Sequence, residues 1–286
     1  KEIKPEIIMI SASGSGTKGP EAGMHALAPV FGALSGLADM TGYADGEPAE
    51  IRISGDYVNS ATVFFVLLAA LWHCKRTGQG QFIDYSSREG LCCFIGDSFM
   101  DYTMNNRVQS RNGNRDDVMA PHNCYRCRGE DKWVSIAIAT EEEWNSFCNA
   151  IGDPEWANEE RFSNACNRWQ NQEELDKLVG EWTIRYSPYE VMDILQKAGV
   201  AAVPSFSAQD MYTDPHLTAR GFTEIVEHPK LGAAMIIRNP WRLSADPPRI
   251  TSHAPLLGEH NEYVFGELLG MGKEEIARLE EAKVIW

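Results

Sequence analysis

Short apolar runs alternate with glycine-rich or helix-like stretches through the first hundred residues. The run EIIMIS, Glu6 to Ser11, leads into ASGSGTKGP, which is typical of a buried strand followed by a glycine-rich loop. From Tyr57 the apolar positions have helical spacing but occupy nearly every face, which predicts an interior helix ending at KRTGQG. QFIDYS then predicts a second strand, and SREGLCCFIGDSFMDYTM a further helix. The order strand, helix, strand, helix predicts an α/β fold with a parallel sheet covered on both faces.

The middle of the chain follows a different pattern. NCYRCRGEDKWVSIAIA alternates apolar and polar residues around the turn RGED, which predicts an antiparallel hairpin. Capping boxes then open two helices, one at Thr140 with Glu143 and one at Ser187 with Glu190. The strand-like HPKLGAAMIIRNPWRLS and a helical tail follow. We therefore predict a first large-domain part at 1–118, a small α+β domain at 119–204, and a linker with a return to the large domain at 205–286.

Composition narrows the possible functions. The chain has 286 residues and a formal net charge of −15, which argues against a nucleic-acid-binding surface but not against a small anionic ligand. No run reaches the roughly 20 apolar residues that a membrane span needs, so no membrane association is predicted. Seven cysteines without a secretory signal predict reduced thiols and a cytoplasmic location. Lys1 is not a methionine, and we expect the beginning of the protein to lie elsewhere.

Two cysteines form the pattern C-x-x-C, Cys124 and Cys127, which is found in zinc and redox sites. Zinc needs four ligands, and the chain holds no second C-x-x-C. We interpret the pair as strand cysteines, one or both of them buried, and predict no metal site.

The loop SGSGTKGP is a candidate anion site, because glycines let backbone N–H groups approach a phosphate. It matches neither of the usual nucleotide-binding glycine patterns, and a simple strand-to-helix turn explains it equally well. Its candidate ligand-binding residues are Ser13, Gly14, Ser15 and Gly16.

Asp56 stands directly before the apolar helix and has two interpretations. Aspartate is among the best helix N-caps, with a contribution of about 1 kcal/mol over alanine. A carboxylate at a helix N-terminus is also kept ionised by the helix dipole, which is the state that nucleophilic catalysis needs. His25 lies upstream and would matter for catalysis only if it faced Asp56.

Taken together, the motifs resemble the class III coenzyme A transferases of the CaiB/BaiF type, a family that includes formyl-CoA transferase and the α-methylacyl-CoA racemases. The resemblance covers essentially the whole chain. It is carried, in order, by SASGSGTKGP, TGYADGEP, GDYVNSATVFFVLLAALWHCKRTGQGQFIDYS, RNGN, DPHLTARGF, HPKLG and APLLGEHNEYVFGELLG.

The resemblance implies a Rossmann-like large domain built from both ends of the chain, a small domain between them, and an interlaced homodimer. It implies that Asp56, in the step Gly55-Asp56, is the catalytic residue and forms covalent aspartyl intermediates. The substrates would be an acyl-CoA and a carboxylic acid, with coenzyme A as a thioester substrate and no prosthetic group.

Three departures from the family pattern affect these expectations. The family's N-terminal segment is absent before Lys1, so the chain is a fragment or a second polypeptide supplies that part. Ser13 and Ser15 stand where formyl-CoA transferase carries a lysine and a tyrosine, which argues against an oxalate-like acceptor. RDDVMAPHN replaces a glycine-rich closing loop.

Two alternatives remain at this point. In a racemase of 2-methylacyl-CoA, Asp56 would act together with an upstream histidine, for which His25 is the candidate. In a non-enzymatic subunit, the chain would complete or regulate a partner, but such a subunit need not retain Asp56.

Overall fold

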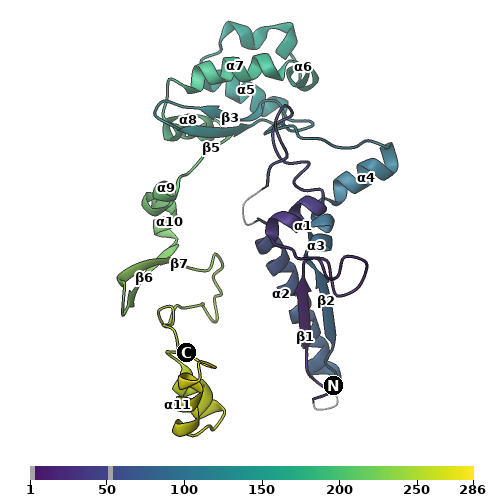
Figure 1. Cartoon of the computed structure of the whole chain (residues 1–286). Coiled ribbons are helices and arrows are strands. Elements are labelled where there is room, and N and C mark those ends of the chain that lie inside the picture. The colour runs from purple at the N-terminus through teal and green to yellow at the C-terminus, as the bar shows by residue number, and fades with distance from the viewer. Residues whose placement is uncertain (1–3, 51–53) are drawn as a thin grey trace. The chain divides into compact units, whose positions relative to one another are not determined.

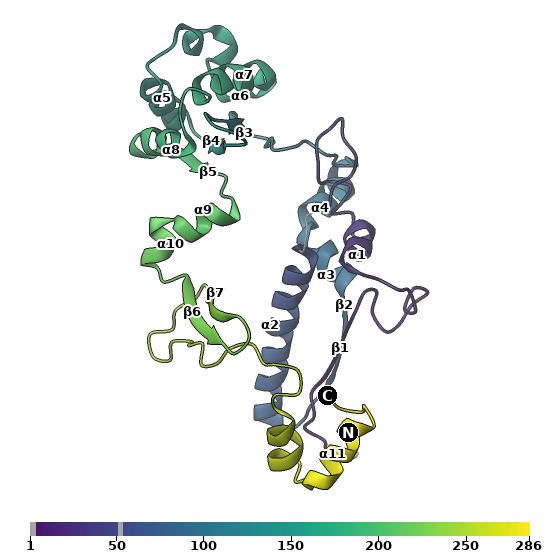
Figure 2. The same cartoon turned by 60° about the vertical axis from the view of Figure 1, so that its left-hand side comes forward.

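A computed structural model describes residues 4–50 and 54–286. The chain separates into two compact units, Lys1–Ser205 and Phe206–Trp286. Figures 1 and 2 show the elements of each unit.

The first half of unit one contains the predicted parallel pair of strands. β1 (Met9–Ser13) pairs with β2 (Phe82–Ser86) in parallel, from Met9 opposite Phe82 to Ser13 opposite Ser86. Both views show the two strands side by side, with helices next to them (Figures 1 and 2). The order of strands and helices agrees with the prediction, except that the last predicted helix is two helices separated at Ile95. The helices are α1 (Ala28–Leu34), α2 (Ser54–Thr77), α3 (Ser87–Phe94) and α4 (Gly96–Asn105).

Helix α2 ends as its sequence predicts. Lys75 and Arg76 lie in its last turn, and the N–H of Gly78 donates to the carbonyl of Cys74 at 2.8 Å, with Gly78 at φ +71°. Basic side chains suit the negative end of the helix dipole, and glycine adopts the left-handed conformation without strain.

The predicted burial of α2 is not observed among the described residues. Ala70 and Asn59 are buried, but Phe65 is 72% exposed and Trp72 66% exposed. Apolar residues on all faces predict a buried helix only where neighbours cover all faces, and here α1 and α3 contact part of it. By length and hydropathy alone, residues Gly55–Thr77 also match a membrane span, contrary to the expectation from sequence. Core helices of soluble proteins have the same length and hydropathy.

The second half of unit one holds a well-packed core. β3 (His122–Arg126), β4 (Trp133–Ala137) and β5 (Ala201–Pro204) form an antiparallel sheet in that order, which confirms the predicted hairpin. Figure 1 shows helices over this sheet. They are α5 (Glu141–Ala150), α6 (Ala165–Gln170), α7 (Gln172–Thr183) and α8 (Pro188–Lys197), together with the 3-10 turns η1 (Glu155–Asn158) and η2 (Glu160–Phe162).

This core contains a buried arginine side chain. Arg168 is 1% exposed, donates to both carboxylate oxygens of Glu141 at 2.9 and 3.0 Å, and stacks on Trp144 with its guanidinium carbon 4.6 Å from the ring centroid. The main apolar residues around it come from both the sheet and the helices, and include Val134, Ile136, Phe147, Phe162, Leu175, Val179, Val191 and Leu195. The capping boxes of α5 and α8 are both present as predicted.

Unit two consists of short elements. A capping box that the sequence patterns did not reveal, Ser207 with Asp210, opens α9 (Ala208–Thr213). Asp214 then caps α10 (Pro215–Ala219) through its side chain. The predicted strand-like stretch, 228–244, is strand only in part: β7 (Gly232–Ile237) lies within it, and β6 (Thr223–His228), which pairs with β7 in an antiparallel hairpin, lies before it except for His228. The helical tail is a π-helical segment, η3 (Glu262–Leu268), followed by α11 (Lys273–Glu281).

The chain is thus a mixed α/β protein. The boundaries predicted at 118/119 and 204/205, and the return of the last segment to the large domain, stay predictions.

Candidate active site

Asp56 is the third residue of α2, so it lies inside the first helical turn. The N-cap interpretation therefore does not fit the described start of the helix at Ser54. The Asp56 side chain is exposed, and no hydrogen bond to its carboxylate is recorded among residues 4–50 and 54–286. A carboxylate in the first turn is favoured by the positive end of the helix dipole, so Asp56 is accessible and in a position that stabilises its anion.

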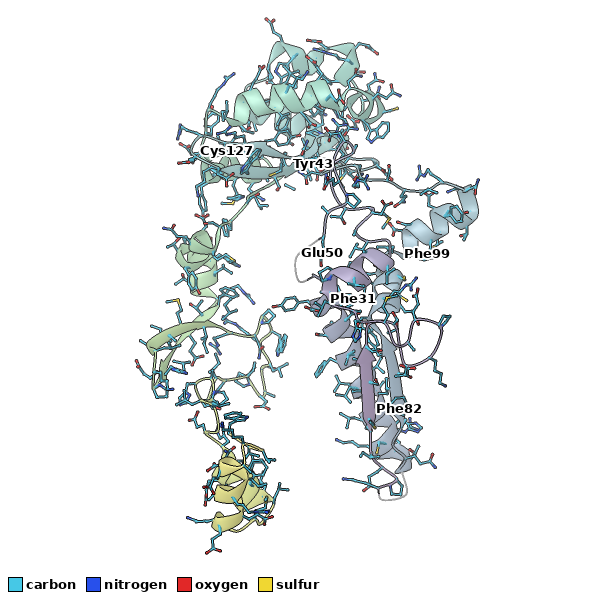
Figure 3. All side chains as sticks on the ribbon, in the orientation of Figure 1. Phe31, Tyr43, Glu50, Phe82, Phe99 and Cys127 are labelled. Carbon is cyan, nitrogen blue, oxygen red and sulfur yellow. The ribbon has the colours of Figure 1, made fainter. Side chains whose placement is uncertain are left out.

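The glycine before Asp56 anchors the start of the helix. Gly55 is buried, and a Cβ at this position would lie 3.0 Å from Cε2 of Phe31 and 3.5 Å from Cδ1 of Leu91. Phe31 belongs to α1 and Leu91 to α3, and both are buried (Figure 3 labels Phe31). The Gly-Asp step therefore packs one residue against two helices and presents the next one to solvent.

A second close contact lies one turn further along α2. Asn59 is buried and its Oδ1 accepts a hydrogen bond from the Tyr85 hydroxyl at 2.7 Å. A Cβ on Gly90 would lie 2.1 Å from that hydroxyl oxygen. The contact fixes α2 to β2 and α3, and the sequence signal that could have revealed it is a glycine inside the helical pattern SREGL.

The glycine-rich loop after β1 is held by the end of β2. Asp84 accepts hydrogen bonds from the Thr17 N–H at 2.9 Å and from the Thr17 hydroxyl, and these bonds lower the pKa of the Asp84 carboxyl. The Arg88 N–H donates to the carbonyl of Gly14 at 3.0 Å. Because the Thr17 N–H is directed at a carboxylate, it is not available to a bound phosphate.

The four predicted ligand-binding positions directly precede Thr17. Gly14 and Gly16 are tightly placed: a Cβ on Gly14 would lie 2.4 Å from Cβ of Ala26, and Gly16 has φ +79°. The hydroxyl oxygens of Ser13 and Ser15 are buried, and neither has a hydrogen-bond partner among the described residues. Buried hydroxyls without a partner are uncommon in folded proteins, and Nδ2 of Asn59 and Nε of Arg111 are in the same state among the described residues.

The RNGN segment, Arg111–Asn114, ties the loop TGYADGEP to the small sheet. The Gly113 N–H donates to the Gly42 carbonyl at 2.8 Å, and Arg111 donates to the carbonyl and the carboxylate of Asp39 at 2.8 and 3.1 Å. Gly113 has φ +67°, and a Cβ there would lie 2.8 Å from Cδ1 of Tyr43 (labelled in Figure 3). The loop held in this way is the one that leads towards α2 and Asp56.

The same segment continues into the small sheet. Asn114 donates to Oδ1 of Asn123 at 3.3 Å, and its carbonyl lies 2.6 Å from Nδ1 of His122. Asn123 and Tyr125 in turn donate to the two carboxylate oxygens of Asp176 at 2.9 and 2.7 Å. The RNGN motif therefore has a structural role, because it joins two parts of unit one.

The segment RDDVMAPHN, which replaces the family's glycine-rich loop, is folded back on itself. Asp116 accepts hydrogen bonds from the N–H groups of Val118 and Met119 at 2.8 and 2.9 Å, and these lower the pKa of its carboxyl. Its carbonyl accepts a hydrogen bond from the indole of Trp169 at 3.1 Å. These bonds hold the segment against α6.

The remaining candidates are His25 and the cysteine pair. His25 is exposed, and it makes no hydrogen bond or ion pair with Asp56 among the described residues. Cys127 is buried, as predicted for one of the strand cysteines, and burial raises the pKa of its thiol to about 11. Within residues 4–50 and 54–286, no group of three or more histidine, cysteine, aspartate or glutamate residues could hold a metal ion.

Comparison with known proteins identifies the family. Residues 1–261 match the sequence profile of CoA-transferase family III. The chain belongs to this family, and the predicted enzyme class, a class III CoA-transferase of the CaiB/BaiF type, is confirmed.

Individual relatives agree with this assignment. The chain is 31% identical over 284 residues to succinyl-CoA–D-citramalate CoA-transferase of Chloroflexus aurantiacus, with 99% of this chain and 70% of the relative covered. It is 30% identical to the alpha subunit of succinyl-CoA–L-malate CoA-transferase of the same organism, with 98% of this chain and 66% of the relative covered. The chain thus spans about two thirds of the length of these curated relatives.

A solved structure confirms the fold. The crystal structure of a CAIB/BAIF family protein from Brucella suis superposes with a TM-score of 0.84 at 27% identity, covering 93% of this chain and 69% of the other.

Proposed function

We propose that the protein moves coenzyme A from an acyl-CoA donor to a carboxylic acid acceptor, with Asp56 as the covalent nucleophile. The observation that carries the proposal is the position of Asp56, exposed in the first turn of α2 directly after a buried glycine, in a chain of CoA-transferase family III. Asp56 lies near the positive end of the α2 dipole, and a carboxylate can act as a nucleophile in covalent catalysis.

The proposed reaction passes activation between carboxylates. A carboxylate oxygen of Asp56 attacks the thioester carbonyl, the C–S bond breaks, and CoA leaves as a thiolate, which gives a mixed anhydride. The thiolate then attacks the aspartyl carbonyl, releases the donor acid and leaves an aspartyl-CoA thioester. The acceptor carboxylate attacks that thioester to give a new mixed anhydride, and the thiolate takes the new acyl group and frees Asp56.

Both anhydrides are sensitive to water, so the complete site must exclude it. The coenzyme A-binding residues that we propose are Ser13, Gly14, Ser15 and Gly16. Their support is the glycine-rich loop itself, whose backbone can approach an anion, and the hydrogen bonds that attach the loop to Asp84 and Arg88. The mechanism needs no prosthetic group and no metal.

The proposed assembly is an interlaced homodimer with a Rossmann-like large domain built from both ends of the chain. An alternative assembly is a heteromer in which a second polypeptide supplies the family's N-terminal segment, and the alpha subunit among the relatives supports that possibility. We propose a cytoplasmic location, consistent with seven free cysteines.

The test is chemical trapping of the aspartyl intermediate. The protein is incubated with succinyl-CoA, a donor suggested by the names of the relatives, and then with hydroxylamine or borohydride, and the modified peptides are mapped by mass spectrometry. We expect modification at Asp56, and a loss of turnover of about a thousandfold or more in Asp56→Ala. Asp97→Asn is the matched control, because Asp97 is an aspartate in the first turn of another helix, α4.

Two results would contradict the proposal. One is an unmodified Asp56 in a preparation that turns over the donor. The other is exchange of the α-proton of a 2-methylacyl-CoA with deuterated water without any adduct, which would favour racemisation.

A further inference from the structure

Unit two contains a pocket of about 470 Å³ beside the β6–β7 hairpin. Its volume lies in the range typical of sites for small organic ligands. Three arginines line it, together with aromatic and other apolar residues. The apolar part of the lining includes Leu217, Phe222, Trp241, Leu243, Pro247 and Pro248.

One of the three arginines is built into the frame of the pocket. The backbone N–H of Arg238 donates to the carbonyl of Phe222 at 2.8 Å. In its side chain, Nε lies 3.3 Å from a carboxylate oxygen of Glu224 and Nη2 donates to the carbonyl of Pro248 at 3.3 Å. The two side-chain contacts hold the guanidinium group at the pocket wall.

The other two arginines have no such counter-charge. Neither Arg220 nor Arg242 has an ion pair with a described residue, and no aspartate or glutamate is among the described residues that line the pocket. The protein as a whole has a net charge of −15, so unpaired arginines in one pocket are not part of a generally basic surface. Like charges held close together repel one another, and an anion between them would offset that repulsion.

Two of the guanidinium groups converge on one point. Gly221 has φ +59°, and a Cβ there would lie 3.7 Å from Nη2 of Arg242 and 3.8 Å from Nη1 of Arg238. Because glycine has no side chain, the two guanidinium groups have room beside it. Glycine also adopts the left-handed conformation readily, and Arg220, Gly221 and Phe222 all line the pocket.

We propose that this pocket binds a small organic phosphate that carries a ring, of the nucleotide class. Guanidinium groups bind phosphate oxygens through paired, charge-assisted hydrogen bonds. The guanidinium groups of Arg238 and Arg242 lie near one point, and Arg220 adds a third positive charge to the lining. Trp241, which is 56% exposed, offers a flat apolar face to the ring. The same chemistry is present in a free nucleotide and in the nucleotide end of coenzyme A.

The test measures binding to the full chain by isothermal titration calorimetry at low and high salt. AMP, coenzyme A and inorganic phosphate are the three probes. AMP binding in Arg220→Gln and Arg242→Gln should weaken by about tenfold in each variant, and more in the double variant. Arg249→Gln is the matched control, because Arg249 is an arginine of the same segment that does not line the pocket.

A second variant tests the ring without touching the charges. Trp241→Ala should weaken AMP binding and leave the binding of inorganic phosphate unchanged. Its side chain is largely exposed, so the substitution does not depend on how well the arginine variants fold. Tighter binding of coenzyme A than of AMP, with the same loss in the arginine variants, would support coenzyme A as the source of the phosphate; equal binding would support a free nucleotide.

Three outcomes would overturn the inference. They are no saturable binding of AMP or coenzyme A at millimolar concentration, binding that the double arginine variant leaves intact, and binding of inorganic phosphate as tight as that of AMP. None of them bears on Asp56, so the inference and the proposed transferase activity can fail separately.

Discussion

The two halves of unit one bury their apolar residues to very different extents. Around the β3–β4–β5 sheet, aromatic and aliphatic side chains such as Phe147 and Leu175 are completely buried, and a buried arginine is paired. Around β1 and β2, the most apolar helix of the chain leaves Phe65 and Trp72 largely exposed. The region that carries the candidate catalytic residue therefore has a less complete core than the small sheet region.

The difference indicates how each half is stabilised. The core of the small sheet region is formed by residues between Ala120 and Ala202, so this region covers its own apolar side chains. The α2 region has apolar faces that gain stability only when something covers them, because burial contributes about 25 cal/mol for each Å² of apolar surface.

A matched pair of phenylalanine substitutions gives the largest expected effect. Phe147→Ala should lower the free energy of unfolding by about 3 to 5 kcal/mol, because it removes a completely buried ring. Phe65→Ala should change it by no more than about 0.5 kcal/mol, since that ring is mostly in solvent. Urea denaturation followed by circular dichroism measures both.

An equally large loss in Phe65→Ala would break the comparison. It would mean that α2 is covered in solution, and repeating the measurement over a range of protein concentrations would then show whether a second copy covers it.

The elements that the sequence predicted well are those defined by neighbours along the chain. The capping boxes at Thr140 and Ser187 and the end of α2 at Gly78 each depend on residues within about four positions. Asp56 was a candidate for the same reason, because a Gly-Asp step before an apolar helix is a local pattern.

The contacts that the sequence did not reveal join residues far apart in the chain. Gly113 meets Tyr43, Arg168 meets Glu141, and Thr17 meets Asp84. Periodicity and capping carry no information about such pairs, since each depends on how the elements pack. The hydroxyls of Ser13 and Ser15, unpartnered among the described residues, belong to the same class, because a lack of partners is visible only once the neighbours are placed.

The second prediction concerns the junction between the two halves. Gly113→Ala should lower the free energy of unfolding by about 2 kcal/mol, since alanine is strained at φ +67° and its Cβ would overlap the Tyr43 ring. Gly78→Ala is the matched control. Gly78 has φ +71°, and a Cβ added there would meet no described atom within 4 Å, so only the strain of about 1 kcal/mol is expected. Equal losses in thermal or urea unfolding would show that the Tyr43 contact contributes nothing.

The third prediction compares two capping boxes of the same design. Ser187→Ala should cost about 1 kcal/mol of global stability, because α8 packs Val191 and Leu195 into the core. Ser207→Ala removes the corresponding cap of α9, a helix with no buried residues, and should leave the unfolding of the small sheet region unchanged. If both substitutions lowered the same unfolding midpoint equally, the two units would unfold together.

The smallest expected effect is a local response to acid at the loop after β1. The Thr17 hydrogen bonds hold the pKa of Asp84 below its ordinary value of 3.8. They therefore stabilise the folded loop fully at pH values above 3.8, where the carboxyl is ionised. This stabilisation should be lost as the pH falls through the lowered pKa, because a protonated carboxyl is a weaker acceptor. Hydrogen exchange at the Thr17 N–H, corrected for its intrinsic pH dependence, should therefore show falling protection in acid. In Asp84→Asn the protection should be weak and independent of pH. The control variant, Asp97→Asn, should behave as the unmodified chain does. If the pH response remained in Asp84→Asn, a group other than Asp84 would be responsible for it.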